Sequence, residues 1–537
     1  MRLYHSRLWL NSLRLFLFIV FGLLAACSPI QAPQTTIQVS VVTVDETTSV
    51  ELPLGSTAEE ALEVAGLEVG ELDRTEPPLY TLLTEGNQVR LIRISEEFDI
   101  EEVIVPFESQ TLRNESLPEG ERRLIQAGVN GIREITYRIV FEDGVEISRN
   151  PVKNTTIQDA VPEIVMIGSQ SPFAPVTLPG QIVYLSGGNA WLMDGESGER
   201  RPVVTTGDLD GRVFSLSPDA EWLLFTRAAA EDEEDINSLW VARLDDSELL
   251  VDLEARNIIH FAEWVPQAVL QIAYSTVEPR STAPGWQANN DLILVSFSPT
   301  GWISDPELVV DANAGGVYGW WGTDFAWSPD GAQLAFARPD GVGLVDFENG
   351  ALQKTMDITP LQTFGDWAWV PGLSWGADNQ SLFTVDHVPT SGGGAAETSQ
   401  WFDVAAVSPD LAQALRIVSQ SGMFASPAAS PSFVLTNDEQ AYLVAYLQAI
   451  FPDQSETSRY QLAVMDRDGS NRRVIFPERG VPGLEPQELA WAPVFRQGEA
   501  TYDLAFIYQG NLWVVNIEDG ELRQLTGDGL ISRIDWK

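Results

Sequence analysis

The stretch FAWSPDG (residues 325–331), followed by the apolar run LAFA (residues 334–337), is one copy of a unit that recurs from about residue 179 to residue 537. The unit predicts a short strand ending in Trp or Ser-Pro-Asp, a turn, an apolar strand, a turn of small residues and another apolar strand. Copies begin at intervals of roughly 45–60 residues, the spacing of four-stranded propeller blades with loop insertions. We therefore expect a mostly β chain whose C-terminal two-thirds is a β-propeller of about seven, alternatively six, four-stranded blades. The other copies begin with FSLSPD (214–219), AEW (262–264), LSW (373–375) and LAW (489–491), and one near SFVL (432–435) lacks the tryptophan.

The last segment of the sequence predicts how the ring closes. ISRIDW (residues 531–536) has the pattern of a first strand, but no second strand follows it. At the start of the repeats, by contrast, three predicted strands form a blade that lacks its first strand; they are residues 181–185, 190–193 and 201–204. Because a lone blade has two exposed edges that a ring protects, we expect the C-terminal segment to pair with these strands and close the ring.

Three stretches in the repeats resemble a known family. The form SPDG-x-x-LAF (residues 328–336) and the hairpins MDRDGSNRR (465–473) and VNIEDG (515–520) are similar to TolB-like (WD-repeat-like) β-propellers. The resemblance covers residues 178–537. It implies a scaffold that binds a protein or a ligand, since propellers host many different activities.

Residues 96–169 carry a second pattern, in which glycines separate short strands with one solvated face. We expect these glycines to serve turns that need a positive φ. Their spacing, with Pro106-Phe107 near the start and Gln126 before the central pair, resembles the G-five (five-glycine) domain. That resemblance implies a surface module associated with adhesion and with binding of glycans that contain N-acetylglucosamine. The five glycines are Gly120, Gly128, Gly131, Gly144 and Gly168.

Residues 37–95 predict a small α+β module. Alternating runs at 37–41 and 49–52 indicate strands, and the order strand, strand, helix, strand follows. Ser56-Thr57-Ala58-Glu59 looks like a capping box that starts a helix before Gly66. The order resembles a ubiquitin-like module found in wall-associated secreted proteins.

The N-terminus predicts export and lipid attachment. Basic residues precede the short apolar run LFLFIVFGLL (residues 15–24), which is too short to span a bilayer and is typical of a signal peptide (residues 1–26). The ending LAAC (24–27) resembles the lipobox of bacterial lipoproteins, which implies diacylation of Cys27 and a spacer at residues 27–36. This places the protein outside a bacterial membrane, anchored to the envelope. The alternative is an ordinary cleaved signal with an incidental cysteine.

Composition narrows the possible chemistry. The chain has 77 Asp and Glu against 32 Lys and Arg, a formal charge of −45, which disfavours nucleic acid as a partner. Cys27 is the only cysteine, so the mature protein has no disulfide and no thiolate metal site.

We find no catalytic, metal or cofactor motif. His260 and His387 are interpreted as structural, and Asp466-x-Asp468-Gly469 as a hairpin turn rather than a calcium loop, because the closing glutamate is absent. Long insertions carry tryptophans that could stack on sugars, with Trp320-Trp321 as the best candidate for a ligand-binding platform. The full set is Trp286, Trp302, Trp320, Trp321, Trp367 and Trp369.

These observations predict a cell-envelope lipoprotein that is not an enzyme. We expect it to bind cell-wall glycan or an envelope protein through the G-five domain and the propeller. The alternative is a secreted carbohydrate-active hydrolase that uses a pair of channel carboxylates. With 77 acidic residues, the sequence does not select that pair.

Overall fold

The computed structural model describes residues 35–115, 117–169, 173–230, 234–246, 248–389, 395–434, 440–493 and 502–537. Cys27 and the expected signal peptide lie outside these ranges. The chain forms two compact units: unit 1 comprises residues up to 110 and 126–163, and unit 2 comprises 111–125 and 164–537. None of the helices in the described part of the chain has the length and apolarity needed to cross a membrane.

Unit 1 begins with a four-stranded sheet and one short helix. The strand order is β2-β1-β4-β3, and β1 and β4 run parallel. Alternation in β1 buries Ile37, Val39 and Val41 in a core that they share with Ala61 and Leu62 of the helix. The elements are β1 (Thr36–Val42), β2 (Thr47–Pro53), α2 (Ala58–Val64), β3 (Arg74–Glu76) and β4 (Gln88–Ile92).

The helix begins one residue later than we expected. Thr57, not Ser56, is the N-cap: its side chain accepts from the Glu60 main-chain N–H, and the Glu60 carboxylate accepts from the Thr57 N–H. Ser56 is held outside the helix, because its N–H donates to the Pro53 oxygen and its own carbonyl accepts from Leu83.

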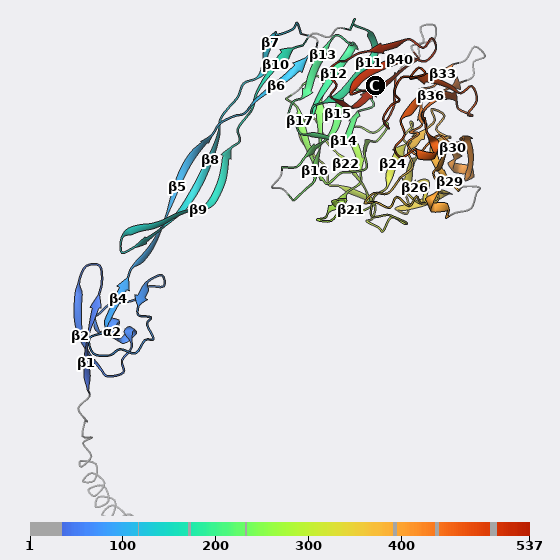
Figure 1. The fold of residues 1–537 in the computed structure, drawn as a ribbon. Coiled ribbons are helices and arrows are strands. Elements are labelled where there is room, and N and C mark those ends of the chain that lie inside the picture. The colour runs from blue at the N-terminus through green and yellow to red at the C-terminus, as the bar shows by residue number, and fades with distance from the viewer. Residues whose placement is uncertain are drawn as a thin grey trace, which may run out of the picture. The chain divides into compact units, whose positions relative to one another are not determined.

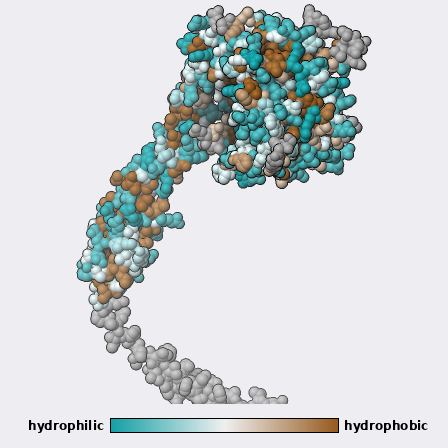
Figure 2. Space-filling model, turned by 45° about the vertical axis from the view of Figure 1, so that its right-hand side comes forward, coloured by the Kyte–Doolittle hydropathy of each residue, from teal (hydrophilic) through white to brown (hydrophobic). Residues whose placement is uncertain are grey.

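The rest of unit 1 is a single-layer sheet of three long antiparallel strands in the order β5-β8-β9. The pairing of β8 with β9 shifts register three times, and such bulges increase the twist of a ladder. Figure 2 shows apolar and polar side chains side by side on this unit's surface. The strands are β5 (Ile94–Val105), β8 (Gly131–Glu142) and β9 (Val145–Gln158).

The five glycines do two different jobs, so our expectation of turns holds for only part of them. Gly120 and Gly144 have positive φ. The other three are needed for close approach: a Cβ would lie 2.3 Å from the Phe107 ring at Gly128, 2.7 Å from main-chain atoms at Gly131 and 1.9 Å from the Pro118 oxygen at Gly168.

A small sheet of order β6-β10-β7 comes first in unit 2. Most residues of its three strands belong to this unit, and only residues at the strand ends belong to unit 1. Leu112, Ile164 and Met166 of this sheet lie in one hydrophobic core with Trp191 and Trp536 from the repeat region. This end of the G-five segment therefore packs as part of the propeller core. The strands are β6 (Ser109–Asn114), β7 (Arg122–Gln126) and β10 (Glu163–Gly168).

The described residues from 177 onward contain seven four-stranded antiparallel sheets, which we number 1 to 7 in chain order and which surround a common centre (Figure 1). Sheet 1 has β11 (Thr177–Ser186), β12 (Asn189–Glu196), β13 (Arg200–Val204) and β42 (Ile531–Trp536); sheet 2 has β14 (Leu209–Leu216), β15 (Trp222–Ala228), β16 (Asn237–Arg243) and β17 (Leu250–Arg256); sheet 3 has β18 (Ala262–Trp264), β19 (Gln271–Tyr274), β22 (Leu292–Ser296) and β23 (Glu307–Val310). Sheet 4 has β24 (Asp324–Trp327), β25 (Leu334–Arg338), β26 (Gly341–Asp346) and β27 (Ala351–Asp357); sheet 5 has β28 (Leu373–Trp375), β29 (Leu382–Val388), β30 (Trp401–Ser408) and β31 (Gln413–Val418). Sheet 6 has β32 (Ala428–Ala429), β35 (Leu443–Ala449), β36 (Tyr460–Asp466) and β37 (Arg473–Phe476); sheet 7 has β38 (Ala490–Trp491), β39 (Asp503–Tyr508), β40 (Asn511–Asn516) and β41 (Leu522–Gln524).

In the described part of the loops, two insertions form hairpins of their own, and three short 3₁₀ turns occur. The hairpins are β20 (Val277–Pro279) with β21 (Trp286–Ala288), inserted in sheet 3, and β33 (Phe433–Val434) with β34 (Gln440–Ala441), inserted in sheet 6; the turns are η1 (Ala396–Thr398), η2 (Pro409–Leu411) and η3 (Pro452–Gln454).

The ring closes as the sequence predicted. β42 pairs antiparallel with β11, so that Trp536 lies opposite Ile182 and Ile534 opposite Tyr184. The first strand of sheet 6 was misplaced: it is Ala428–Ala429, paired with Val444 and Ala445, and not the segment near 432–435. Phe433 and Val434 of that segment form β33 of the inserted hairpin. The sequence there lacks the tryptophan that marks the first strand in most of the other sheets.

Candidate functional site

β42 of sheet 1 and the first strands of sheets 2 to 7 surround a central cavity of about 780 Å³. This volume is within the range of small-molecule sites in proteins. Its lining is polar to an unusual degree: charged side chains lie on strands of sheets 1 to 4, in the segment that leads into sheet 7 and at the residue that follows β42. The charged lining residues are Arg212, Glu263, Asp324, Glu488, Asp535 and Lys537, and His260 lies among them.

Glu263 and Asp324 are the two carboxyls most affected by this position. Burial raises the pKa of Glu263 to about 7, and the charge of Lys537 partly offsets the effect. Burial also raises the pKa of Asp324 to about 7, with a further contribution from the charge of Glu488. Two carboxyls that titrate near neutrality can each give or take a proton at physiological pH.

Glu263 and Asp535 also join neighbouring sheets. The Glu263 Oε2 atom accepts from the Trp327 main-chain N–H at 3.4 Å, and Asp535 Oδ2 accepts from the Leu216 N–H at 2.7 Å. Lys537 Nζ lies 3.9 Å from Asp535 Oδ1. Asp324 differs, because its Oδ1 atom accepts a hydrogen bond from the adjacent Phe325 N–H of its own strand, at 2.9 Å. Of these three carboxyls, Asp324 is the one that accepts no hydrogen bond from a neighbouring sheet in the described part of the chain.

One part of the cavity wall is backed by aromatic rings. The His260 ring lies 6.0 Å from Trp286 and 5.6 Å from Trp321, and the Arg212 guanidinium lies 5.5 Å from the Trp286 ring. Burial lowers the pKa of His260 to about 4, while its hydrogen bond with the Trp321 main chain opposes the shift. His260 is therefore neutral at pH 7, which fits a structural role.

The structure brings three of the predicted tryptophans together. Trp321 lies 5.3 Å from Trp286 and 5.8 Å from Trp320, measured between ring centroids. All three are half-buried, and they stand behind His260 and Arg212 rather than in the cavity lining. Trp321 thus packs against His260 of the cavity wall, and Trp320 packs against Trp321.

The other predicted tryptophans lie apart from this group. Trp369 is buried with Phe402 and His387, Trp367 packs beside the same core, and Trp302 is 59% exposed. The two His387 ring nitrogens lie 2.7 Å from the Thr359 oxygen and 2.8 Å from the Ser399 oxygen, which is a structural arrangement. Asp468 accepts from the Ser470 N–H at 2.9 Å, as a hairpin turn requires.

Sequence reasoning missed the charged lining, although the repeat contains a signal for it. Glu263 and Asp535 come directly before the repeat tryptophans Trp264 and Trp536. Asp324 and Glu488 come three residues before Trp327 and Trp491. Residues one and three places before the tryptophan share one face of the first strand, and that face lines the cavity. In the described part of the chain, no group of three or more His, Cys, Asp or Glu is placed to hold a metal ion.

The propeller region is similar to solved structures of enzymes. It matches the periplasmic gluconolactonase PpgL of Pseudomonas aeruginosa at 13% identity and a TM-score of 0.40, over 66% of this chain and 98% of that one. It matches an oligogalacturonate lyase in complex with manganese at 11% identity and a TM-score of 0.36, over 70% and 97%. Enzymes therefore occur with this architecture, and this overturns our expectation that the chain is not an enzyme. The likeness shows the fold alone and assigns no activity here.

The preceding segment matches a different set of proteins. Two curated relatives are 24% identical: resuscitation-promoting factor Rpf2 of Corynebacterium glutamicum, over 26% of this chain and 37% of the relative, and RpfB of Mycolicibacterium smegmatis, over 24% and 34%. This chain thus spans about a third of their length. The solved structure of HP0197-G5 matches at 24% identity over 14% of this chain and 99% of that one, with a TM-score of 0.14. Residues 96–170 match the family model described as G5 domain, and this part of the chain is therefore a G5 domain.

Proposed function

We propose that this chain is a cell-envelope protein that binds wall glycan through its G5 domain and holds a small polar ligand in the propeller cavity. The G5 match is the observation that carries the first part. In the long sheet of that domain, Phe98 is 64% exposed on one face. On the opposite face Tyr137 lies under the Arg149 guanidinium at 5.7 Å. The exposed Phe98 ring and the half-buried Tyr137 ring beside a guanidinium are suited to stacking on and hydrogen-bonding to a sugar.

Binding to insoluble peptidoglycan tests this proposal. The protein beginning at residue 35 is expected to sediment with peptidoglycan, which contains N-acetylglucosamine. Phe98→Ala and Tyr137→Ala are expected to weaken binding by about tenfold each. Tyr80→Ala is the matched control, since Tyr80 is 82% exposed in the first module of unit 1. Equal binding by all three variants would reject the G5 sheet as the contact.

We also propose that Cys27 is acylated and anchors the protein, and that the seven sheets are the blades of a closed propeller. The order of basic, apolar and small residues before Cys27 supports the anchor. Labelled palmitate is expected to join the wild-type chain and not Cys27→Ala. Label on both or on neither would reject the anchor.

A second function is supported by the two cavity carboxyls. Hydrolysis of a glycosidic bond needs one carboxyl that donates a proton and one carboxylate that activates water or attacks carbon. Glu263 and Asp324, both with a pKa near 7, could divide those roles. Release of reducing sugar from wall polysaccharide, lost in Glu263→Gln and in Asp324→Asn, would support it. Full activity in both variants would reject it.

A further inference from the structure

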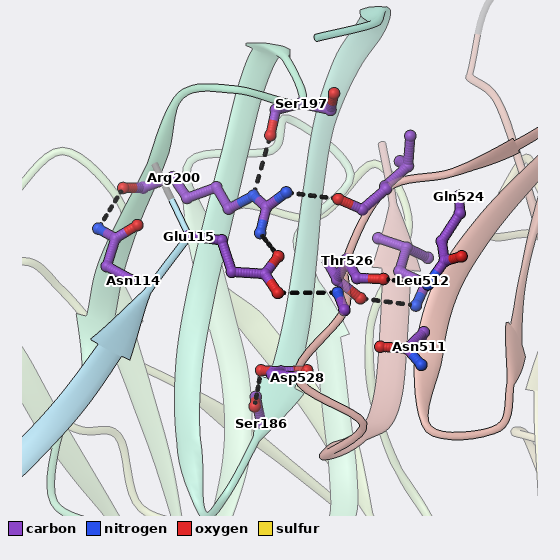
Figure 3. A network of polar contacts seen from close by, with 12 residues as sticks. Asn114, Glu115, Ser186, Ser197, Arg200, Asn511, Leu512, Gln524, Thr526 and Asp528 are labelled. Atoms are coloured by element: carbon purple, nitrogen blue, oxygen red, sulfur yellow. Dashed lines mark hydrogen bonds and ion pairs between the residues drawn. The ribbon is translucent and has the colours of Figure 1, made fainter. Parts of the chain in front are cut away.

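A buried ion pair holds the loop that leads into the ring-closing strand (Figure 3). Glu115, which follows β6 in the G5 domain, pairs with Arg200 at the start of β13. Arg200 also donates to the Leu525 oxygen, and Glu115 Oε1 accepts from the Gly527 N–H at 2.8 Å. We call Glu115, Arg200, Leu525 and Gly527 the seam clamp.

The two charged side chains of the clamp are largely buried, and their charges are well satisfied. The side chains are 5% exposed for Arg200 and 11% for Glu115. The Arg200 Nε donates to the Ser197 oxygen at 2.9 Å, so the guanidinium is fixed on three sides. A planar guanidinium can hold such a fork of acceptors, and lysine cannot.

The clamped loop leads directly to the cavity wall. Next to the clamp, the Ser186 hydroxyl donates to Asp528 at 2.9 Å. Ile531 then enters the core shared with Leu112 and Met166, and the strand ends with residues that line the cavity. The lining residues of β42 and its end are Ile534, Asp535, Trp536 and Lys537.

We propose that Glu115 and Arg200 position the ring-closing strand, so that the G5 segment controls whether the propeller cavity is complete. With the clamp intact, β42 stays paired with β11 and presents Asp535 and Lys537 to the cavity. Loss of the clamp frees residues 525–536 to open locally while the other sheets stay folded. Glu115 and Arg200 are positioning residues and do not line the cavity themselves. The proposal does not depend on the cavity ligand proposed above.

Hydrogen exchange of the full chain tests the clamp. Glu115→Gln is expected to raise amide exchange in residues 525–536 by about tenfold and to leave β25 and β29 unchanged. Glu121→Gln is the matched control, because Glu121 makes an exposed ion pair with Arg123 in the same segment. The proposal would be overturned if the amides of residues 525–536 exchanged no faster in Glu115→Gln than in Glu121→Gln. So would an equal rise in all sheets, since that is only a loss of global stability.

A second variant and the wild type cover the case in which Glu115→Gln does not fold. Arg200→Lys keeps the positive charge but cannot reach Glu115, Ser197 and Leu525 together, so it is expected to give the same local rise. In the wild type, the amides of residues 525–536 are expected to open together, at a lower denaturant concentration than those of β25. Opening of both segments in one global step, with no local rise in Arg200→Lys, would overturn the clamp. Intact peptidoglycan binding in these variants would show that a failure here leaves the proposed function standing.

Discussion

The indole Nε1 of Trp375 donates a 2.9 Å hydrogen bond to the main-chain oxygen of Ala326 in the neighbouring sheet. Trp264 and Trp491 make the equivalent bonds, to Ser215 and to Ala428. Trp327 occupies the same repeat position, but its Nε1 atom is buried without a hydrogen-bond partner in the described part of the chain. Of these four tryptophans, three therefore join neighbouring sheets through the indole N–H, and Trp327 does not.

This difference predicts the cost of removing the indole N–H. Trp375→Phe is expected to destabilise the propeller by about 1–3 kcal/mol beyond the loss of ring area, because the Ala326 oxygen loses its donor. Trp327→Phe removes a buried N–H that has no acceptor, so it is expected to cost less. Urea unfolding of both variants measures the difference. Equal losses would show that ring packing, and not the hydrogen bond, decides the position.

The cavity carboxyls predict how stability changes with pH. For Glu263 and Asp324 the folded-state pKa, about 7, lies above the ordinary values of 4.5 and 3.8. The folded chain thus holds these protons more tightly than the unfolded chain. The stability that these two groups contribute is fully present below about pH 4. It falls as the pH rises to about 7, by roughly 3 kcal/mol for Glu263 and roughly 4 kcal/mol for Asp324.

Glu263→Gln and Asp324→Asn are therefore expected to flatten the loss of stability between pH 5 and pH 8, measured by urea unfolding. Asp346→Asn is the control with the opposite sign. Hydrogen bonds from Asn349 and other turn groups lower the pKa of Asp346, so its contribution is present at neutral pH and lost on acidification. A pH slope that is unchanged in both cavity variants would contradict the assigned environment.

Gly322 predicts a steric test of the aromatic group behind the cavity. A Cβ at this position would lie 2.3 Å from the His260 Cδ2 atom, on a backbone with φ of +151°. Gly322→Ala is expected to displace His260 from Trp286 and Trp321, and to cost about 1–3 kcal/mol. Near-UV circular dichroism and urea unfolding report both effects. Gly372→Ala, where the nearest atom is 3.9 Å away, is expected to leave both signals unchanged.

Arg200 predicts a large loss of stability for the seam clamp. Arg200→Met leaves the Glu115 carboxylate buried without its cation, which is expected to cost about 3–5 kcal/mol. Arg123→Met breaks an ion pair whose arginine is 59% exposed, and is expected to change stability by about 1 kcal/mol or less. Thermal unfolding of the two variants compares them directly. Similar losses would mean that Arg200 is no more important than a surface arginine.

Much of the fold could be predicted because residues close together in the sequence determine the strands and turns of each repeat. Ser328-Pro329-Asp330 was interpreted as a blade turn, and the Ser328 hydroxyl indeed donates to Asp330 at 2.7 Å and accepts from the Gln333 N–H at 2.9 Å. The ring closure could be predicted because residues 531–536 formed a strand without a partner. Both features depend on neighbours in sequence or on simple counting of strands.

The cavity could not be predicted in the same way. Glu263 and Asp324 are separated from Glu488 by more than a hundred residues, and only the closed ring brings them to one space. The seam clamp has the same property, because Glu115 and Gly527 are 412 positions apart. Such contacts leave no pattern within any window of the sequence. The three close-packed glycines of the G5 domain were misread for the same reason, since the Cβ clash at Gly168 is with Pro118 from another loop.

The pairing of β11 with β42 has a consequence for biosynthesis. Trp536 donates to the Pro179 oxygen across 357 positions of chain, so the ribosome completes six sheets before the first one receives its fourth strand. Until then the nascent β11 carries an open edge, which another emerging copy could occupy. A chaperone that shields this edge during synthesis is expected to raise the yield of monomer more than one that shields any other strand.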